Sequence, residues 1–390
     1  MEEAVREIRV TEALQQPRWG DARQVRRVRE ALAARPPLVR AEDIARLRTR
    51  LAAVARGEAL VVQAGDCAED PRECTRVDAD RKRAVLDLLA GALRATAHRP
   101  VIRVGRIAGQ FAKPRSRPTE RVGDCELPSY RGHLVNAPEA DADSRRPDPL
   151  RILTGYMAAA ELLGHLGWRP GAGTAPPEAA VWTSHEALLM DYEVPLVRTA
   201  EDGTPFLGST HWPWIGERTR QVTGAHVALL AEVGNPVACK VGPGTTPAEL
   251  LALCARLDPE REAGRLTLIA RMGAEKVAEL LPRLVAAVRA AGHPVIWLSD
   301  PMHGNTLTAP GGHKTRRVRT LAQEVSRFCA AVRGEGGVPG GLHLETTPDE
   351  VTECVSGDAA LDHVGDRYTS LCDPRLTPWQ ALSVVQAWGT

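Results

Sequence analysis

Four residues with metal-binding side chains lie far apart in this chain, and three of them follow apolar, β-prone runs. Cys67, His303 and Glu345 stand at the ends of such runs, whereas Asp373 lies in a loop beyond the last one. A thiolate, an imidazole and two carboxylates suit a borderline divalent cation that keeps open positions and polarises a carbonyl group. Spacing alone leaves two alternatives open: a closed structural site, or no metal at all.

Four cations occupy similar places, at the ends of apolar runs or in the loops after them: Arg106, Arg218, Lys240 and Arg271. Arginine offers a fork that binds phosphate or carboxylate through two hydrogen bonds, whereas lysine acts as a point charge. The mixed set therefore favours a ligand with both groups, such as a phosphorylated carboxylic acid. The alternative is that these cations form structural ion pairs with Glu217, Asp300 or Glu345.

A proline-braced loop with the sequence KPRS brings Lys113, Arg115 and Ser116 close together. Two cations and a hydroxyl group in one short loop favour a second phosphate site. A solvated basic surface is the alternative, because most charged loops are exposed.

The elements that must position these residues alternate between short β-prone runs and helical segments from residue 59 onward. The helical segments include residues 246–257, which open with a threonine cap, and residues 273–292, which carry an apolar stripe. Such alternation predicts a parallel sheet. The predicted strands are residues 59–67, 100–109, 180–186, 205–212, 235–243, 266–273, 294–304 and 341–347.

Ionisable residues recur at the carboxyl ends of all the predicted strands, as in a TIM barrel, where the loops after the strands carry the active site. A doubly wound sheet would gather its site at one switch point, and the sequence has no GxGxxG or GxxxxGK loop. We therefore predict an α/β protein with a (β/α)8 TIM barrel over residues 59–390 and an N-terminal helical extension over residues 1–58. The connection 110–179 after strand two is expected to form a long lid insertion with at least two helices, and residues 304–316 another active-site loop.

Charge and composition point to a small-molecule partner. A net charge of +1 leaves no electrostatic footprint for nucleic acid, and no apolar run reaches the length that spans a bilayer. The charged start, MEEAVREIRV, is unlike a signal peptide, so we expect a cytoplasmic protein. The eight cysteines include no CxxC pair and are interpreted as reduced thiols.

The motifs together resemble those of the type II (plant-like) 3-deoxy-D-arabino-heptulosonate 7-phosphate (DAHP) synthases. The resemblance runs in order from about residue 14 to the C-terminus. It is carried by QAGDCAE (63–69), GRIAGQFAKPRS (105–116), LPSYRG (127–132), SHEALLMDYE (184–193), WIGERTRQ (214–221), SDPMHGNT (299–306), GLHLE (341–345) and CDPRL (372–376).

The resemblance implies a TIM-barrel enzyme that condenses phosphoenolpyruvate with erythrose 4-phosphate, the first step of the shikimate route. It implies a divalent metal, Mn²⁺ or Co²⁺, on Cys67, His303, Glu345 and Asp373, and a homo-oligomer, either a dimer or a tetramer. Lys240 and His303 are the expected groups for proton transfer. Phosphoenolpyruvate is expected at Arg106, Lys113, Glu217, Arg218, Lys240 and Arg271, and erythrose 4-phosphate toward Lys113, Arg115 and Ser116.

Two departures from the family pattern bear on regulation and substrate choice. His133 replaces the acid that usually follows the YRG motif, in the lid region, and the segment around residues 137–170 is short. Weak or absent feedback inhibition, as in a specialised aromatic pathway, is the expectation from the shortened segment. A relative that uses an amino-substituted sugar phosphate and a non-catalytic regulatory paralogue are the alternative functions.

Overall fold

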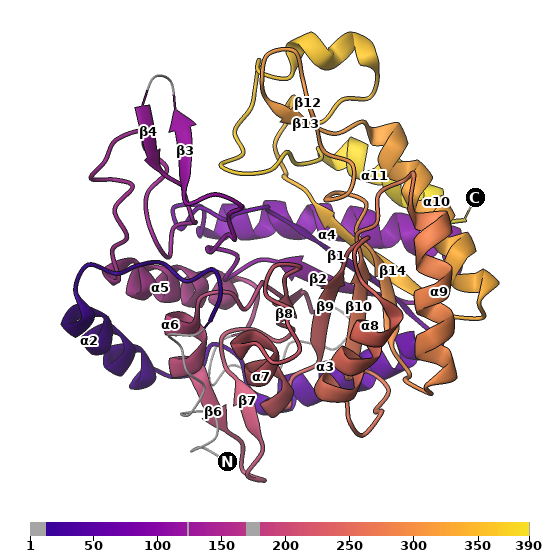
Figure 1. Ribbon diagram of the computed structural model, residues 1–390, viewed down its shortest axis with the longest axis horizontal. Coiled ribbons are helices and arrows are strands. Elements are labelled where there is room, and N and C mark those ends of the chain that lie inside the picture. Colours follow the sequence, from indigo (N-terminus) through magenta and orange to yellow (C-terminus); the bar gives the residue numbers. More distant parts are fainter. Residues whose placement is uncertain (1–12, 123–124, 169–179, 390) are drawn as a thin grey trace.

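The computed structural model describes residues 13–122, 125–168 and 180–389, and its centre is a curled sheet of parallel strands (Figure 1). The strands pair in the order β5-β2-β1-β14-β11-β10-β9-β8, so that each lies beside its chain neighbours and the first lies beside the last. The strands are β1 (Leu60–Gly65), β2 (Val101–Arg106), β5 (Trp182–Thr183), β8 (Trp214–Ile215), β9 (Val237–Val241), β10 (Leu266–Ala270), β11 (Ile296–Ser299) and β14 (Pro339–Glu345).

A bridge between Glu186 and Trp214 closes this sheet into a barrel. The backbone N–H of Trp214 donates to the carbonyl of His185, and that of Ala187 donates to the carbonyl of Trp214, both at 3.0 Å. These bonds join the segment after β5 to β8, the two ends of the strand order. The predicted (β/α)8 barrel is therefore confirmed, and it brings the carboxyl ends of its strands to one face.

Helices cover the outside of the barrel, and three of them begin at threonine caps. Thr75 and Asp78 form a capping box at the start of α4, while Thr246 caps α8 and Thr377 caps α11. These side chains satisfy N–H groups that the first helical turn leaves unpaired. The outer helices are α4 (Arg76–Ala97), α5 (Leu150–His165), α7 (Ala225–Glu232), α8 (Pro247–Leu257), α9 (Val277–Ala290), α10 (Val318–Gly334) and α11 (Pro378–Gln386).

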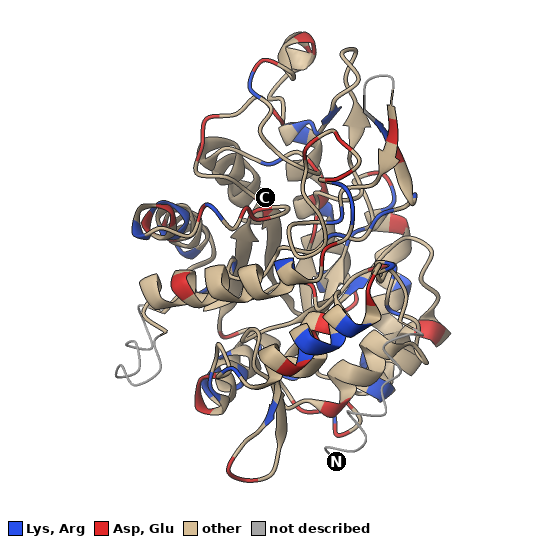
Figure 2. Ribbon diagram, turned by 90° about the vertical axis from the view of Figure 1, so that its left-hand side faces the viewer, with Lys and Arg blue, Asp and Glu red and all other residues tan. Residues whose placement is uncertain are grey.

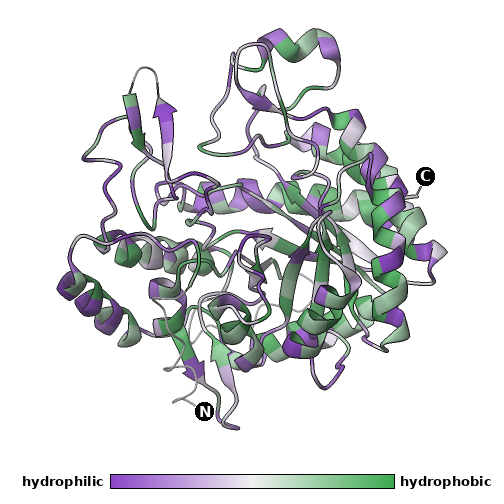
Figure 3. Cartoon of the chain, in the orientation of Figure 1, coloured by the Kyte–Doolittle hydropathy of each residue, from purple (hydrophilic) through white to green (hydrophobic). Residues whose placement is uncertain are grey.

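Apolar side chains fill both sides of the central strands, as expected for a parallel sheet covered by helices. All residues of β9, β10 and β11 are buried, and Figure 3 shows the central strands mainly in hydrophobic colours. In Figure 2 acidic and basic residues alternate over the outer helices. Within the described ranges, none of the helices has both the length and the apolar character that a membrane span requires.

The fourth strand was predicted at residues 205–212, and this position is wrong. Only Pro205–Leu207 (β7) is extended there, and it pairs antiparallel with β6 (Val197–Thr199) in a hairpin outside the barrel. Gly208 then bonds to the backbone of Leu38 and Leu196 instead of joining a barrel strand. The barrel strand is the two-residue β8, seven residues further along the chain than the end of β7.

The insertion after β2 holds one helix, α5, in its described part, rather than the two or more that we predicted. Before α5 it forms an antiparallel hairpin of β3 (Thr119–Val122) and β4 (Cys125–Pro128). Prolines at positions 138, 147 and 149 explain why the stretch between β4 and α5 stays irregular, because proline disfavours helical backbone at the residue before it. Part of the link predicted at residues 167–180, namely 169–179, lies outside the described residues.

In the described part of the chain before β1, which begins at residue 13, two helices precede the barrel. The first, α2 (Ala22–Ala33), packs against α5 and the short α6 (Met190–Glu193). The second, α3 (Ala41–Ala55), reaches the amino ends of the strands, where Arg48 donates to the carbonyl of Gly234 at 3.2 Å. At Gly264, with φ of +87°, a Cβ atom would lie 2.4 Å from the Arg48 carbonyl, so this close approach requires glycine. The division at residue 58 stays a prediction.

Candidate functional site

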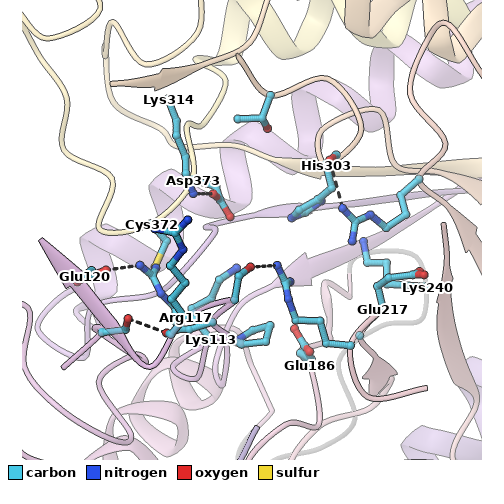
Figure 4. A pocket seen from close by; sticks show the side chains of 18 of the residues that line it. Lys113, Arg117, Glu120, Glu186, Glu217, Lys240, His303, Lys314, Cys372 and Asp373 are labelled. Atoms are coloured by element: carbon cyan, nitrogen blue, oxygen red, sulfur yellow. Dashed lines mark hydrogen bonds and ion pairs between the residues drawn. The ribbon is translucent and has the colours of Figure 1, made fainter. Parts of the chain in front are cut away.

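A cavity of about 940 Å³ opens at the carboxyl ends of the strands. Lys240 reaches it from the end of β9, Arg271 from the loop after β10 and His303 from the loop after β11. Figure 4 shows Lys240 and Glu217 on the side opposite Cys372 and Asp373. Seven of the eight predicted substrate-binding residues line this cavity: Lys113, Arg115, Ser116, Glu217, Arg218, Lys240 and Arg271.

The four predicted metal ligands converge beside the cavity. One ligand atom from each of Cys67, Glu345 and Asp373 lies within 4.8 Å of the others. The Cys67 Sγ is 3.7 Å from Asp373 Oδ2, and His303 Nε2 is 3.3 Å from Glu345 Oε1. This set of sulfur, nitrogen and carboxylate donors fits a borderline divalent cation. Cys67 and Asp373, which are 306 positions apart in the sequence, thus lie next to each other in the fold.

Asp300 orients the imidazole of His303. Its Oδ2 lies 2.8 Å from His303 Nδ1, so that ring nitrogen is occupied and Nε2 faces Glu345. A carboxylate on the second nitrogen of a metal-binding histidine fixes the tautomer and raises the basicity of the ligand. The geometry therefore leaves His303 Nε2 as the nitrogen for a metal.

Glu345 is the most heavily paired carboxylate of the site. Its Oε1 accepts from Arg106 Nη2 at 3.1 Å, and its Oε2 accepts from Arg316 Nη1 at 2.9 Å. Burial alone would raise the pKa of Glu345, but His303, Arg316 and Arg106 hold it well below its usual range. Glu345 is therefore ionised, as a metal ligand must be.

Arg106 lies beneath the cavity rather than in its lining. Its side chain is 1% exposed and donates to the Asp66 carbonyl at 3.1 Å and to Glu345. Its Nη1 is 2.5 Å from His343 Nε2, and the guanidinium stacks over Trp214 at 5.1 Å from the ring centre. In this structure Arg106 therefore supports Glu345, in the manner of the ion-pair alternative.

The cations in the lining differ in how freely they face the cavity. Lys240 pairs with Asp300 at 2.6 Å, and Arg218 Nη2 donates to Ser116 Oγ at 2.6 Å. Arg271 donates to the carbonyl of His303 at 3.2 Å. Burial lowers the pKa of Lys240 to about 8, although Asp300 opposes this shift. The cavity lining nevertheless holds more Lys and Arg residues than Asp and Glu residues, which suits an anionic ligand.

Lys113 lies beside the metal-binding donors, with its Nζ 4.0 Å from Glu345 Oε1. Burial lowers its pKa, but the nearby Cys67, Glu345 and Asp373 raise it overall, so the ammonium group stays charged. Its backbone N–H donates to the carbonyl of Arg131 at 2.8 Å, which fixes the KPRS loop against the LPSYRG segment. A charge in this position can attract a substrate toward both halves of the site.

Two of the predicted substrate-binding residues, Glu217 and Arg115, form pairs with oppositely charged neighbours. Glu217 accepts from Arg220 Nη2 at 2.9 Å, and Arg115 forms an ion pair with Glu120 of β3. His133 lies away from the main cavity, in a second hollow of about 490 Å³ with Asp70, and burial lowers the pKa of its imidazole.

Sequence reasoning missed several residues of the cavity, namely Glu186, Thr306, Lys314, Arg316 and Cys372. Lys314 and Arg316 lie in or beside the hairpin of β12 (Leu307–Thr308) and β13 (Lys314–Thr315), within the loop predicted near the site. Lys314 pairs with Asp373 at 2.8 Å. The basic run HKTRR was the available signal for these cations.

The fold and the site together define a (β/α)8-barrel protein with an anion-binding cavity and donors for a divalent metal. The class-II DAHP synthetase family matches the chain over residues 3–175 and 161–387. The chain therefore belongs to this family, and the resemblance inferred from its motifs is confirmed.

Individual relatives agree with this assignment. The chain is 58% identical, over 392 aligned positions, to a "Probable phospho-2-dehydro-3-deoxyheptonate aldolase" of Pseudomonas fluorescens, with 100% of this chain and 97% of the relative covered. It is 41% identical to a "Phospho-2-dehydro-3-deoxyheptonate aldolase" of Streptomyces coelicolor, which covers 95% of this chain and 93% of that protein.

A solved structure supports the fold. The "Phospho-2-dehydro-3-deoxyheptonate aldolase" of Francisella tularensis superposes with a TM-score of 0.55 at 14% identity. The match covers 92% of this chain and 96% of that one. At this low identity the similarity concerns the fold alone.

Proposed function

We propose that this protein is a DAHP synthase that condenses phosphoenolpyruvate with erythrose 4-phosphate and releases inorganic phosphate. The observation that carries the proposal is that Lys113, Arg218, Lys240 and Arg271 line one cavity, beside the donor cluster of Cys67, Glu345 and Asp373. An enol phosphate, which carries both a phosphate and a carboxylate group, fits the cations, and an aldehyde fits the donor side.

In the proposed reaction C3 of phosphoenolpyruvate bonds to the aldehyde carbon of erythrose 4-phosphate, water adds at C2, and phosphate leaves. When bound to Cys67, His303, Glu345 and Asp373, Mn²⁺ or Co²⁺ supplies Lewis-acid polarisation of the aldehyde. Arg218, Lys240 and Arg271 hold the enol phosphate and offset its charge, a contribution of orientation and electrostatics.

Lys240 and His303 are the two groups predicted to transfer protons. Lys240 has an ammonium pKa of about 8 and stands at the end of β9, inside the cavity. The Nδ1 of His303 is held by Asp300 and its Nε2 is assigned to the metal, which leaves Lys240 as the proposed proton-transfer group. From the family resemblance, Lys113, Arg115 and Ser116 are assigned to the phosphate end of erythrose 4-phosphate, and all three line the cavity.

The direct test is consumption of phosphoenolpyruvate by purified, Mn²⁺-loaded protein, followed through the ultraviolet absorbance of the enol phosphate. Consumption that requires erythrose 4-phosphate and yields one phosphate per molecule supports the proposal. Consumption only with an amino-substituted sugar phosphate would show that this sugar, and not erythrose 4-phosphate, is the substrate. Absence of consumption with either sugar would leave the regulatory paralogue as the better account.

The setting of the enzyme is also a proposal. A homodimer or homotetramer, a cytoplasmic location and a role in a specialised aromatic pathway follow from the family and the shortened segment 137–170. Native mass spectrometry of the full chain tests the first of these, and a monomer at micromolar concentration would contradict it.

A further inference from the structure

A buried network of charged groups lies directly behind the metal-binding donors. Asp66, the residue before Cys67, is 2% exposed and accepts from Arg375 Nη1 at 2.8 Å. Its second oxygen lies 3.0 Å from Lys82 Nζ, which extends from α4. The backbone on one side of Cys67 is therefore anchored through a carboxylate held by two cations.

The same guanidinium anchors the segment that carries Asp373. Arg375 donates to Glu353 Oε1 at 2.9 Å through Nη2 and to Glu353 Oε2 at 3.1 Å through Nε, which is a two-bond fork. Its Nη2 also donates to Thr369 Oγ1 at 2.6 Å. Its own backbone N–H donates to Glu353 at 2.7 Å, so both the backbone and the side chain of Arg375 are bonded to Glu353.

Glu353 also fixes the backbone turn from Thr369 to Asp373. It accepts from the backbone N–H groups of Thr369 at 3.1 Å and of Ser370 at 2.7 Å. Ser370 Oγ donates to the Asp373 carbonyl at 2.6 Å. The position of the Asp373 carboxylate thus depends on a carboxylate that is itself paired with Arg375.

We propose that Arg375 is a positioning residue of the metal centre. It holds Cys67 and Asp373 close enough to each other to bind the same metal ion. The proposal rests on the metal-dependent function proposed above. Arg375 contacts the anchors of both ligands, Asp66 on one side and Glu353 on the other, while its own side chain does not enter the cavity lining.

The arrangement explains why an arginine stands here. Its planar fork binds Glu353 with two nitrogens and still directs a third toward Asp66, which an ammonium group cannot do in a fixed plane. Without the guanidinium, two buried carboxylates would lack their shared cation, an arrangement that is costly. Movement of either one displaces a ligand, because Cys67 adjoins Asp66 and the Thr369–Asp373 turn is bonded to Glu353.

The test compares Arg375→Lys and Arg375→Met with the wild-type protein, and uses Arg317→Lys and Arg317→Met as matched controls. Arg317 also pairs with an aspartate, Asp358, but this pair is partly exposed to solvent. Co²⁺ is titrated into the metal-free proteins, and the thiolate-to-cobalt absorption reports the Cys67–metal bond. Mn²⁺ affinity is measured separately by competition with a chelator.

We expect both Arg375 variants to bind Mn²⁺ about 10 to 100 times more weakly, the usual effect of removing an outer-shell partner of a metal site. The thiolate absorption should be weakened or displaced even at saturating Co²⁺. At saturating metal, the KM for phosphoenolpyruvate should change less than kcat, because the cations in the cavity lining are untouched. The Arg317 variants should match wild type in every readout.

The outcomes separate this inference from the proposed function. If the wild-type protein itself shows no thiolate absorption with Co²⁺, Cys67 is no ligand and the metal centre as proposed fails. If the wild type shows it and folded Arg375 variants keep both the band and the affinity, the positioning role is overturned. Should Arg375→Met not fold, Asp66→Asn removes the same ion pair with little change of shape and must weaken Mn²⁺ binding in the same way.

Discussion

The ammonium nitrogen of Lys240 lies 2.6 Å from Oδ2 of Asp300, and both side chains are almost completely buried. The same oxygen lies 2.8 Å from His303 Nδ1. One carboxylate therefore connects a cation of the proposed phosphoenolpyruvate site with a proposed metal ligand. This contact links the two halves of the site through a single side chain.

The charge of Lys240 predicts the alkaline side of the pH profile. Burial lowers its pKa to about 8, so the ammonium group is present below that pH and is lost as the pH rises through it. We expect kcat/KM for phosphoenolpyruvate, which reports the free enzyme, to fall above about pH 8. In Lys240→Arg the cation persists at every accessible pH, so this decline should disappear. A decline of unchanged midpoint in the variant would assign it to another group.

Arg218 tests the anion-binding role of the lining. Its Nη2 donates to Ser116 Oγ at 2.6 Å, and its guanidinium lines the cavity. We expect Arg218→Lys to raise the KM for phosphoenolpyruvate about tenfold, or about 1.4 kcal/mol, because lysine lacks the fork. Steady-state kinetics measure this. Arg256→Lys, which changes an exposed pair with Glu232, is the matched control, and equal kinetics in both variants would contradict the role of Arg218.

The strand ends were predictable because each is a local pattern. An apolar run followed by an ionisable residue identified the positions of Lys240, Arg271, His303 and Glu345, and the barrel topology then brings such ends together. The fourth strand was misplaced for the same reason. Its apolar run forms the β6–β7 hairpin, while β8 is too short for a periodic pattern.

Other features depend on contacts between distant residues and leave no local signal. Arg316 meets Glu345 only because the segment after β13 folds over β14, and Arg375 meets Asp66 across 309 positions. The pairing of Arg106 with Glu345 was only an alternative at the sequence level, because the sequence shows a cation at a strand end but not which acid or histidine it contacts.

Metal removal tests the donor set. We expect a chelator to abolish phosphoenolpyruvate consumption and added Mn²⁺ to restore it. Cys67→Ser should weaken Mn²⁺ binding at least about tenfold, because a hydroxyl is a poorer donor than a thiolate. Cys329→Ser makes the same change at a buried cysteine of α10, outside the donor cluster, and should keep wild-type affinity. Equal metal affinities of the two variants would remove Cys67 from the site.

Glu324 of α10 connects the loop that carries Arg271 with the loop that carries His303. Its Oε1 accepts from the backbone N–H of Gly273 at 2.9 Å, and its Oε2 accepts from Asn305 Nδ2. Burial raises the pKa of this carboxyl group to about 7, although both hydrogen bonds oppose the shift. At neutral pH the group is therefore close to its titration midpoint.

The raised pKa of Glu324 predicts a pH-dependent stability. Between the model-compound pKa of 4.5 and about 7 the folded protein holds a proton that the unfolded chain has lost. The resulting stabilisation is complete below pH 4.5 and is lost as the pH rises through about 7, by at most about 1.4 kcal/mol per pH unit. Relative to Glu324→Gln, which does not titrate, wild type should thus lose stability from pH 5 to pH 8. Urea denaturation midpoints of the metal-free proteins measure this difference. The control Glu279→Gln alters an exposed glutamate and should follow wild type, and parallel pH curves for wild type and Glu324→Gln would show that Glu324 titrates normally.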